Sequence, residues 1–540
     1  MDNRPRLAVD IGGTFTDLVL SSAAGTTSTK VLTTPDAPEQ GVLNGVSVVL
    51  ADSGTAPNDV GLVIHGTTLA TNALIERKGA RTALLATDGF RDSVEIAYEH
   101  RFEQYDLYME RPEPLVPRHL RFGVPERIAA DGEVLLDLDE SAIEALVPEL
   151  KAAGIESIAI CFLHSYINAD HERRAGELLA ARLPGVAITL SCEVCPEIRE
   201  YERMSTACAN AYVQPLMAGY IRALETGLQE RGMSCPLLLM MSSGGVTTVE
   251  TAAKHPIRLV ESGPAGGVIL AQNVSAQCGV RETLSFDMGG TTAKLTLIDD
   301  LKPQYSRAFE VARQYRFLKG SGLPIRIPVI DMVEIGAGGG SIARLDELRR
   351  LSVGPDSAGA MPGPACYGQG GKAPTVTDGD VVLGRIDPDQ FADGKIPLDA
   401  IAARTAVQSV LADPLGIEPV IAAAGIAEIV DETMASAARV HAVENGKDTA
   451  GRHLVATGGA APLHAARLAE KLGIEHVIVP AGAGVGSAHG FLCAPIAYEV
   501  VRTRFMRLDA FEPALLNSLF AEMRAEAEAV VRLGAPQAPL

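Results

Sequence analysis

The sequence predicts an α/β fold of two related lobes, each containing a β-hairpin that is closed by a pair of glycines. Two observations lead to this prediction. A pattern of strand, Gly-Gly turn and strand occurs at residues 7–20 and again, without a gap, at residues 284–297. A third Gly-Gly pair, at residues 458–459, opens a helical pattern. Because the two hairpin copies are far apart and do not form a tandem array, we interpret them as parts of two duplicated lobes.

Length and composition indicate a soluble globular protein. The chain has 540 residues, which is enough for two or more domains, and 47% of them are hydrophobic while 21% are charged. It carries 47 basic and 67 acidic residues, for a net charge of −20, so we expect no nucleic-acid partner. A loop of backbone N–H groups can still hold a phosphate inside an acidic protein.

The chain shows no sign of a membrane segment or a disulfide framework. No apolar signal region precedes the strand-like residues 7–9, and the long uncharged stretch 477–498 is interrupted by prolines and glycines. The eight cysteines are sparse, and Cys192 and Cys195 form a single pair where a structural zinc site needs four ligands. We therefore expect a cytoplasmic protein that does not contact a membrane.

The first hairpin places a carboxylate and a glycine turn side by side. Asp10 ends an apolar strand, and Gly12, Gly13, Thr14 and Thr16 follow it. Glycines let the backbone approach a ligand closely, and successive N–H groups at such a turn form a concave site for an anion. The threonines add hydroxyl donors, and the aspartate can hold Mg²⁺. One such hairpin would most simply be an ordinary Gly-Gly turn.

The second hairpin repeats the same residues in the same order. Asp287 ends the incoming strand, and Gly289, Gly290, Thr291 and Thr292 form the turn. Two gap-free copies favour a pair of phosphate-binding turns over two unrelated hairpins. We therefore predict that Asp287 and its counterpart in the first hairpin are the catalytic carboxylates that hold Mg²⁺ and phosphate.

The third glycine pair follows the two hairpins in the chain. Gly458 and Gly459 follow the strand-like residues 453–457 and precede a helical pattern over 460–473, so a flat base could lie against their backbone. Alone, this would be a plain strand-to-helix turn. Behind two hairpins, it matches the adenosine motif of the actin-like sugar kinase and chaperone ATPase superfamily. The sequence thus predicts a two-lobed actin-like fold that binds ATP.

Several segments together resemble the hydantoinase A / 5-oxoprolinase family. This family includes ATP-dependent N-methylhydantoinase, 5-oxoprolinase, a lactamase that acts on caprolactam, and subunits of acetone and acetophenone carboxylases. The matching segments follow the family's order over nearly the whole chain and comprise residues 9–17, 65–73, 262–267, 286–292, 334–341 and 362–368. The chain departs from the family's pattern at Ala461, at residues 375–380 (usually Thr-Asp-Ala-Asn) and at residues 444–448.

The resemblance implies an ATP-dependent ring-opening of a cyclic amide: a hydantoin, 5-oxoproline or a small lactam. This chain would be the A subunit, which uses ATP and Mg²⁺ to phosphorylate the ring amide oxygen. A B-type hydantoinase subunit would then add water. Three alternatives remain open: a subunit of an ATP-dependent ketone carboxylase, a non-catalytic ATP-binding scaffold or switch, and a kinase that releases a stable phosphorylated product.

A donor-rich turn follows the apolar run at residues 62–64. It contains His65, Thr67 and Thr68, and Asn72 lies on the helical stretch behind it. The turn could bind a substrate amide, or Thr68 could simply support the N-terminus of the helix. The residues alone favour neither interpretation, whereas the family resemblance favours substrate binding.

The chain divides into three parts in this interpretation. Residues 1–190 form the first lobe with inserted substrate-facing elements, and residues 200–497 form the second lobe with the second hairpin and the adenosine loop. Residues 498–540 contain an amphipathic helix at about 514–533. Because chains of the family are longer, we expect this last part to begin a further C-terminal domain.

Overall fold

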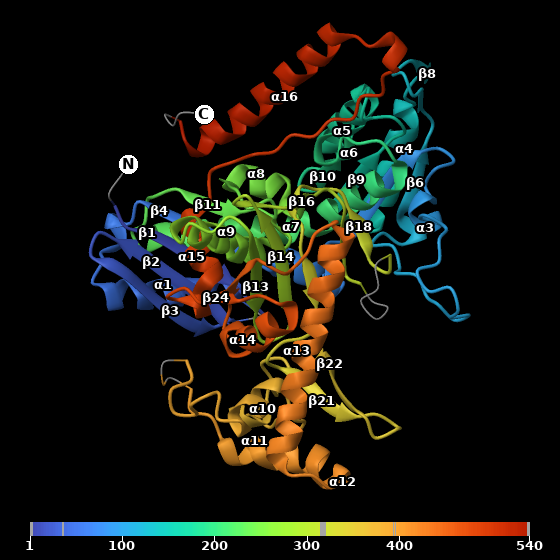
Figure 1. Cartoon of the computed structure of the whole chain (residues 1–540). Helices are drawn as coiled ribbons and strands as arrows, with labels where there is room; N and C mark the ends of the chain where they lie inside the picture. The colour runs from blue at the N-terminus through green and yellow to red at the C-terminus, as the bar shows by residue number, and fades with distance from the viewer. Residues whose placement is uncertain are drawn as a thin grey trace.

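The structure is a computed structural model that describes residues 4–13, 15–34, 37–313, 320–392, 394 and 396–536. Its first lobe contains a six-stranded sheet in the order β12-β11-β4-β1-β2-β3 (Figure 1). β1 runs antiparallel to β2 and parallel to β4, and β4 runs parallel to β11. The strands are β1 (Arg6–Ile11), β2 (Phe15–Ser22), β3 (Gly25–Leu32), β4 (Leu62–Thr67), β11 (Leu237–Met240) and β12 (Val246–Thr248).

The second lobe repeats this topology in the order β15-β14-β13-β23-β24, with β20 paired to β14. β13 runs antiparallel to β14 and parallel to β23, which runs parallel to β24. The strands are β13 (Thr283–Met288), β14 (Ala293–Asp299), β15 (Lys302–Pro303), β20 (Val333–Ile335), β23 (His453–Thr457) and β24 (His476–Ile478). The chain therefore has the α/β, two-lobed actin-like fold that its duplicated hairpins predicted.

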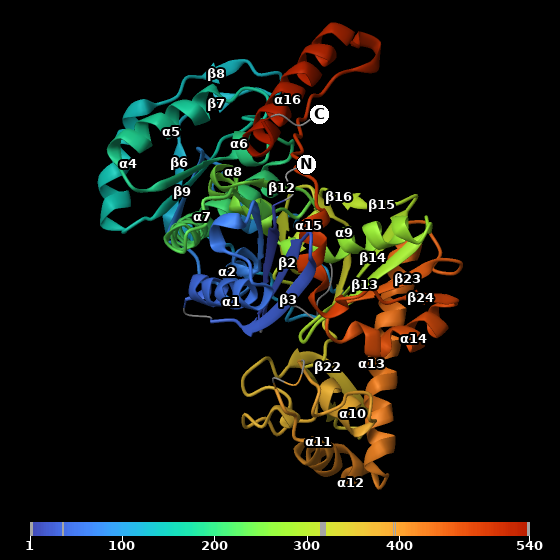
Figure 2. The same ribbon diagram turned by 90° about the vertical axis from the view of Figure 1, so that its left-hand side faces the viewer.

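Two helices pack against each other between the two sheets. They are α9 (Ser262–Gln277) and α15 (Gly486–Cys493), and Figure 2 shows them between the sheet with β2 and the sheet with β14. Their close crossing depends on glycine, because a Cβ on Gly490 would overlap the carbonyl oxygen of Gly266. Phe491 of α15 is fully buried and packs over Gly66 and Gly266. The two lobes thus meet in a core in which backbones approach more closely than side chains would allow.

The first lobe carries a large insertion between β4 and β11. Its four-stranded parallel sheet has the order β10-β9-β5-β6 and is flanked by helices (Figure 2). The elements are β5 (Thr82–Thr87), β6 (Arg121–Val124), β9 (Ser157–Cys161), β10 (Ala187–Leu190), α4 (Glu140–Ala152), α5 (Asp170–Arg182) and α7 (Glu200–Glu230). Because β11 and β12 complete the first sheet from beyond residue 190, that sheet crosses the division made from the sequence. The domain boundaries themselves stay a prediction.

A smaller module lies between β20 and β23 in the chain. In Figure 1 it lies below the two sheets, and α13 runs from it back into the second lobe. Its elements are β21 (Ser341–Leu345), β22 (Leu351–Ser357), α10 (Val376–Val382), α11 (Ala400–Val407), the π-helix Gln408–Ala412, α12 (Asp413–Leu415) and α13 (Pro419–Glu444). Thr375 and Asp378 form a capping box at the start of α10, which fixes the entry of this helix.

The remaining elements connect and cover these parts. The helices are α1 (Pro38–Ser53), α2 (Leu69–Ile75), α3 (Ser93–Ile96), α6 (Ser191–Val194), α8 (Val249–Lys254), α14 (Ala461–Leu472) and α16 (Pro513–Gly534). The short strands are β7 (Arg127–Ile128), β8 (Val134–Leu136), β16 (Tyr305–Ser306), β17 (Phe309–Val311), β18 (Leu323–Ile325) and β19 (Val329–Ile330). The helix expected near residues 514–533 is present as α16, at the top of Figure 1.

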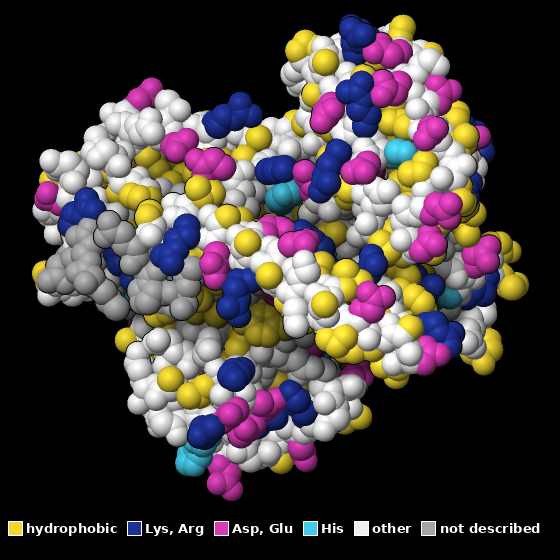
Figure 3. Space-filling view, turned by 90° about the horizontal axis from the view of Figure 1, so that it is seen from above, with side chains coloured by type: hydrophobic (Ala, Val, Ile, Leu, Met, Phe, Trp, Pro, Cys, Tyr) yellow, Lys and Arg dark blue, Asp and Glu magenta, His cyan; other side chains and the backbone are white. Residues whose placement is uncertain are grey.

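The surface mixes both signs of charge. On the face seen from above in Figure 3, Lys and Arg side chains alternate with Asp and Glu side chains. In the described part of the chain, no single helix is both long and apolar enough to cross a membrane. Among the described residues, one bent pair, 400–415 and 419–444, with an angle of 95° between its two halves, meets the criteria by length and composition.

Candidate active site

The two predicted carboxylates lie against one face of α9. A Cβ on Gly263 would lie 3.2 Å from Oδ1 of Asp10, and a Cβ on Gly267 would lie 3.0 Å from Oδ2 of Asp287. Residues four apart share a helix face, so the two contact points are about 6 Å apart along the axis of α9. Helix α9 therefore brings together Asp10, from the end of β1, and Asp287, from the end of β13.

The two hairpin turns are closed in the same way. The N–H of Gly12 donates to the carbonyl of Phe15 at 2.9 Å, and the N–H of Gly289 donates to the carbonyl of Thr292 at 3.1 Å. A set of turn residues is exposed: Gly13, Gly289, Gly290 and Thr291. Both turns thus offer backbone to solvent beside a carboxylate. Thr14 lies outside the described residues.

The turn glycines leave open space rather than adopting unusual dihedral angles. None of the four turn glycines has a positive φ: Gly12, Gly13, Gly289 and Gly290. A Cβ on Gly13, Gly289 or Gly290 would meet no atom within 4 Å. The backbone conformation therefore does not require glycine at these three positions, and the space above them is free for a ligand.

Thr16 supports the first turn from behind. Its side chain is fully buried and shares a hydrogen bond of 3.1 Å with the hydroxyl of Thr33. That hydroxyl donates to the carbonyl of Gly12 at 2.9 Å. Thr16 is therefore connected to the turn through Thr33, and its predicted contact with the nucleotide stays a prediction.

The predicted adenosine loop joins the end of β13. The N–H of Ala460 donates to the carbonyl of Met288 at 3.0 Å. Gly458 has a φ of +88°, and a Cβ there would overlap a carboxylate oxygen of Asp287. Glycine is required at this position both by the backbone conformation and by the close approach. Gly459, next to it, is exposed. The loop thus lies beside the second carboxylate.

A further glycine loop covers the second turn. The N–H of Gly339 donates to the carbonyl of Gly289 at 3.0 Å, and the N–H of Gly340 donates to that of Gly290 at 2.6 Å. A Cβ on Gly338 would lie 2.6 Å from the carbonyl carbon of Thr291. The backbone of this loop therefore lies directly on the turn and fixes its position.

The two carboxylates have different electrostatic surroundings. Burial, together with the neighbouring charges of Asp17 and Asp287, raises the pKa of Asp10 to about 7. Burial also raises the pKa of Asp287, but Lys294 opposes this effect. The difference follows from the strand register, which places Asp17 opposite Asp10 and Lys294 opposite Asp287. The hairpins therefore match in backbone but not in charge.

The residues fit a bound cation. Oδ1 of Asp10 and the hydroxyl of Thr457 are buried and have no hydrogen-bond partner among the described residues. A partnerless buried carboxylate oxygen with a second carboxylate nearby is suited to a cation. In the described ranges, no three His, Cys, Asp or Glu side chains cluster as metal ligands. A Mg²⁺ ion here would therefore take most of its ligands from phosphate oxygens and water.

An ion pair beside the second turn was not predicted from the sequence. Nζ of Lys294 lies 2.5 Å from a carboxylate oxygen of Glu261 and 3.3 Å from one of Glu334. Glu261 precedes α9 with a φ of +62°, which is uncommon for a residue other than glycine. An alignment of the two hairpins could have revealed this lysine, because the basic Lys294 in the second hairpin occupies the position of the acidic Asp17 in the first.

His65 is part of the core. Its side chain is 1% exposed, and Nδ1 donates to the carbonyl of Val9 at 3.2 Å. The hydroxyl of Tyr220 donates to Nε2 at 2.8 Å. Burial lowers the pKa of His65 to about 4, so the ring is neutral. Both ring nitrogens are engaged inside the protein, and the contact of His65 with a substrate stays a prediction.

The rest of this turn lies beside the first hairpin. The hydroxyl of Thr68 donates to the carbonyl of Ile11 at 3.2 Å, and Nδ2 of Asn72 donates to the same hydroxyl at 3.5 Å. Thr67, rather than Thr68, supports the start of α2, because its hydroxyl accepts the N–H of Leu69 at 3.1 Å. Thr68 and Asn72 are partly exposed next to the first turn.

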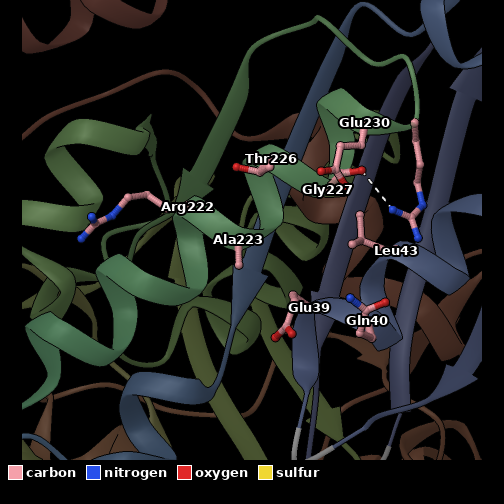
Figure 4. A pocket seen from close by; sticks show the side chains of 9 residues that line it. Glu39, Gln40, Leu43, Arg222, Ala223, Thr226, Gly227 and Glu230 are labelled. Carbon is pink, nitrogen blue, oxygen red and sulfur yellow. Dashed lines mark hydrogen bonds between the residues drawn. The ribbon is translucent and has the colours of Figure 1, made fainter.

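A separate groove lies between α1 and α7. Figure 4 shows its lining, with Glu39 and Gln40 from α1 and Thr226 and Glu230 from α7, and its volume is about 380 Å³. None of the residues assigned to the site lines it. The predicted site residues therefore lie outside this groove.

Comparison with known proteins identifies the family. Residues 203–500 match the family described as hydantoinase/oxoprolinase, and residues 6–183 match its N-terminal region. The chain belongs to the hydantoinase/oxoprolinase family. It is 38% identical over 513 residues to the caprolactamase α subunit of Pseudomonas jessenii, in an alignment that covers 93% of this chain and 72% of that protein.

Solved structures of the family share the fold. The crystal structure of the ATP-dependent caprolactamase from Pseudomonas jessenii matches with a TM-score of 0.85 and 36% identity, over 98% of this chain and 76% of that one. The nucleotide-free structure of acetone carboxylase, described as an enzyme of ATP-dependent carboxylation, matches with a TM-score of 0.81 and 28% identity, also over 98% and 76%. Members of this hydantoinase/oxoprolinase family thus include ATP-dependent enzymes of more than one substrate class.

Proposed function

We propose that this chain is the A-type subunit of an ATP-dependent enzyme that opens a cyclic amide: a hydantoin, 5-oxoproline or a small lactam. It binds ATP at the two hairpin turns and transfers the γ-phosphoryl group to the ring amide oxygen. The observation that carries the proposal is the meeting of Asp10 and Asp287 on one face of α9, with the adenosine loop bonded to the strand that ends near Asp287.

The chemistry follows from the weakness of an amide as an electrophile. The amide oxygen attacks the γ-phosphorus, the bond from that phosphorus to the β-γ bridging oxygen breaks, and ADP leaves. The ring carbon, which now carries the phosphate, accepts a water molecule, and the adduct expels the ring nitrogen as an amine, so that the C–N bond breaks and an acyl phosphate remains. A second water attacks the carbonyl carbon of this acyl phosphate and releases inorganic phosphate, which keeps the former ring oxygen, and the carboxylate. Because the amide oxygen carries no proton, the phosphoryl transfer needs no general base. The chain's task is to position the reacting groups and to stabilise the charge that develops during the transfer.

The residues of the site divide this task between them. The exposed N–H groups around Gly13 and Gly290 would hold phosphate oxygens. Asp10 and Asp287 would hold Mg²⁺, which when bound neutralises charge on the β- and γ-phosphates. The acidic groups Asp10, Asp17, Asp287 and Glu261 outnumber Lys30 and Lys294, so the described site is suited to a nucleotide only together with a cation.

The substrate amide would lie near Thr68 and Asn72. Both side chains are polar, partly exposed and connected to the first turn through the carbonyl of Ile11. We expect Asn72→Ala to raise the concentration of cyclic amide needed for half-maximal turnover, with ATP binding unchanged. The same replacement at the exposed Asn517 of α16, Asn517→Ala, is the matched control and should leave both quantities unchanged.

A subunit of a ketone carboxylase is the second candidate. It is supported by the match to the acetone carboxylase structure, which extends over 98% of this chain. The higher identity to the caprolactamase subunit, 38%, favours the cyclic amide. ADP release that depends on a ketone together with bicarbonate, and not on an amide, would support the carboxylase.

The experiment measures ADP and ring-opened acid in parallel. The chain is assayed with hydantoin, 5-oxoproline, caprolactam and acetone, alone and with a B-type partner subunit. We expect a cyclic amide to stimulate ADP release by the chain alone with little ring-opened product, and the partner to couple the two. Complete ring opening by the chain alone would overturn the two-subunit proposal. If no amide or ketone stimulates ADP release, the chain acts as an ATP-binding scaffold instead.

A further inference from the structure

A buried histidine lies between two aspartates behind the adenosine loop. His464 is on α14, and its side chain is 0% exposed. Nδ1 lies 2.8 Å from a carboxylate oxygen of Asp431 on α13, and Nε2 lies 3.2 Å from one of Asp380 on α10. The two aspartates are 1% and 2% exposed. None of these three side chains is part of the site described above.

The geometry sets the charge of the ring. Carboxylate oxygens only accept hydrogen bonds, so both ring nitrogens of His464 must carry hydrogen and the ring is an imidazolium. Burial alone would lower the pKa of His464, but the hydrogen bonds to Asp380 and Asp431 outweigh it and raise the pKa to about 9. A buried charge with two partners is strongly tied to both of them.

Helix α10 connects this ring to the second phosphate turn. At the start of α10, the N–H and the hydroxyl of Thr377 donate to the carbonyl of Gly339 at 2.7 Å and 2.8 Å. Gly339 in turn donates its N–H to the carbonyl of Gly289. Asp380 follows Thr377 by three residues, one helical turn further on. One short helix therefore contacts the loop on the second turn and His464.

Helix α14 connects the same ring to the adenosine loop. It begins at Ala461, directly behind Gly458 and Gly459, and His464 lies in its first turn. Asp380 is held from its other side by Arg385, with an N–O distance of 3.1 Å. Contacts therefore run from the second phosphate turn through α10 and His464 to the loop predicted to hold adenosine.

We propose that Asp380, His464 and Asp431 are positioning residues that hold the second phosphate turn and the adenosine loop at a fixed spacing for ATP. This inference rests on the proposed binding of ATP and adds the residues that set its geometry. The three side chains do not touch the nucleotide. They act through α10 and α14, so their loss should weaken nucleotide binding.

The proposal gives nucleotide affinity a dependence on pH. A histidine with a raised pKa contributes fully below its ordinary value of 6.5, and its contribution is lost as the pH rises through about 9. The charged groups that face the ring are Asp380 and Asp431, with Arg385 behind Asp380. Asp380→Asn removes one of the two negative charges, so the loss should begin at lower pH.

The test measures the Kd of Mg-ATP by calorimetry with the full chain, from about pH 6 to about pH 10. We expect His464→Gln to raise the Kd about tenfold near neutral pH, the effect of one lost charge-assisted hydrogen bond. Asp380→Asn should move the alkaline loss of affinity down by about one pH unit or more. Glu432→Gln is the matched control, because Glu432 follows Asp431 on α13 but is exposed.

The outcomes separate this inference from the proposed function. If the wild-type chain binds Mg-ATP and Asp380→Asn has the Kd and pH profile of the control, the positioning role is wrong and the proposed function stands. If the wild-type chain does not bind ATP, both are wrong. A variant that only melts at lower temperature, with an unchanged pH profile, shows a structural role and also overturns the inference. Should His464→Gln fail to fold, the near-isosteric Asp380→Asn decides.

Discussion

Replacement of Lys294 by methionine tests the ion pair beside the second turn. Lys294→Met keeps the length of the side chain and removes the ammonium group that lies 2.5 Å from Glu261. Only 15% of the lysine side chain and 11% of the glutamate side chain are exposed, so the lost partner is not replaced by water. Removing one partner of a buried pair costs about 3 kcal/mol at the lower end of the usual range.

This cost can be read from the melting temperature. About 2 °C is lost per kcal/mol in a unit of this size, so calorimetry should show a decrease of about 6 °C or more. Adding Glu261→Gln to the same chain should restore most of it, because of the two carboxylates paired with Lys294 only that of Glu334 then remains, and its side chain is 43% exposed to water. Arg174→Met is the matched control, because Arg174 pairs with Glu140 at 48% and 47% exposure, water screens such a surface pair, and its loss should hardly change the melting temperature. Equal shifts for Lys294→Met and the control would refute the reasoning.

Three further predictions concern the turns and the carboxylates. Asp287→Ala should abolish Mg²⁺-dependent ATP turnover and leave the circular dichroism spectrum unchanged, and retained turnover would contradict the assignment. Asp10→Asn should also abolish turnover but raise the melting temperature at about pH 8. Burial raises the pKa of Asp10 from 3.8 to about 7, so ionisation of this carboxyl costs stability in the folded protein. The gain in melting temperature should therefore disappear below about pH 4, where the carboxyl is protonated in both states. Gly290→Val should abolish ATP binding in equilibrium dialysis while the melting temperature stays the same, because a side chain there meets only the space for a ligand; unchanged binding would make the turn an ordinary hairpin.

The fold could be predicted because the duplication is visible in the sequence. Asp10 and Asp287 occupy equivalent places in two gap-free hairpins, and the structure puts these hairpins into sheets of the same strand order. The sequence could not show that both carboxylates lie against α9. Gly263 and Gly267 are four residues apart, but this spacing does not reveal which side chains approach a helix from other parts of the chain.

The details of the site depend on contacts that local patterns do not contain. Thr16 follows the first turn in sequence, yet the pairing of β2 with β3 buries its hydroxyl against Thr33. His65 precedes a polar turn, yet α7 brings Tyr220 onto its ring from 155 residues away. Asp380 gives no signal in the sequence, because its partner His464 is 84 residues distant. Each of these contacts joins elements that only the tertiary fold brings together.

The central claim is that the ring amide oxygen receives the γ-phosphoryl group. It can be followed with a cyclic amide that carries oxygen-18 at the ring carbonyl, in the presence of ATP, Mg²⁺ and the partner subunit. Mass spectrometry then determines where the label goes. The account predicts that inorganic phosphate carries the labelled oxygen, because the O–P bond formed in the first step is kept. Unlabelled phosphate, with all of the label in the carboxylate of the ring-opened product, would contradict it.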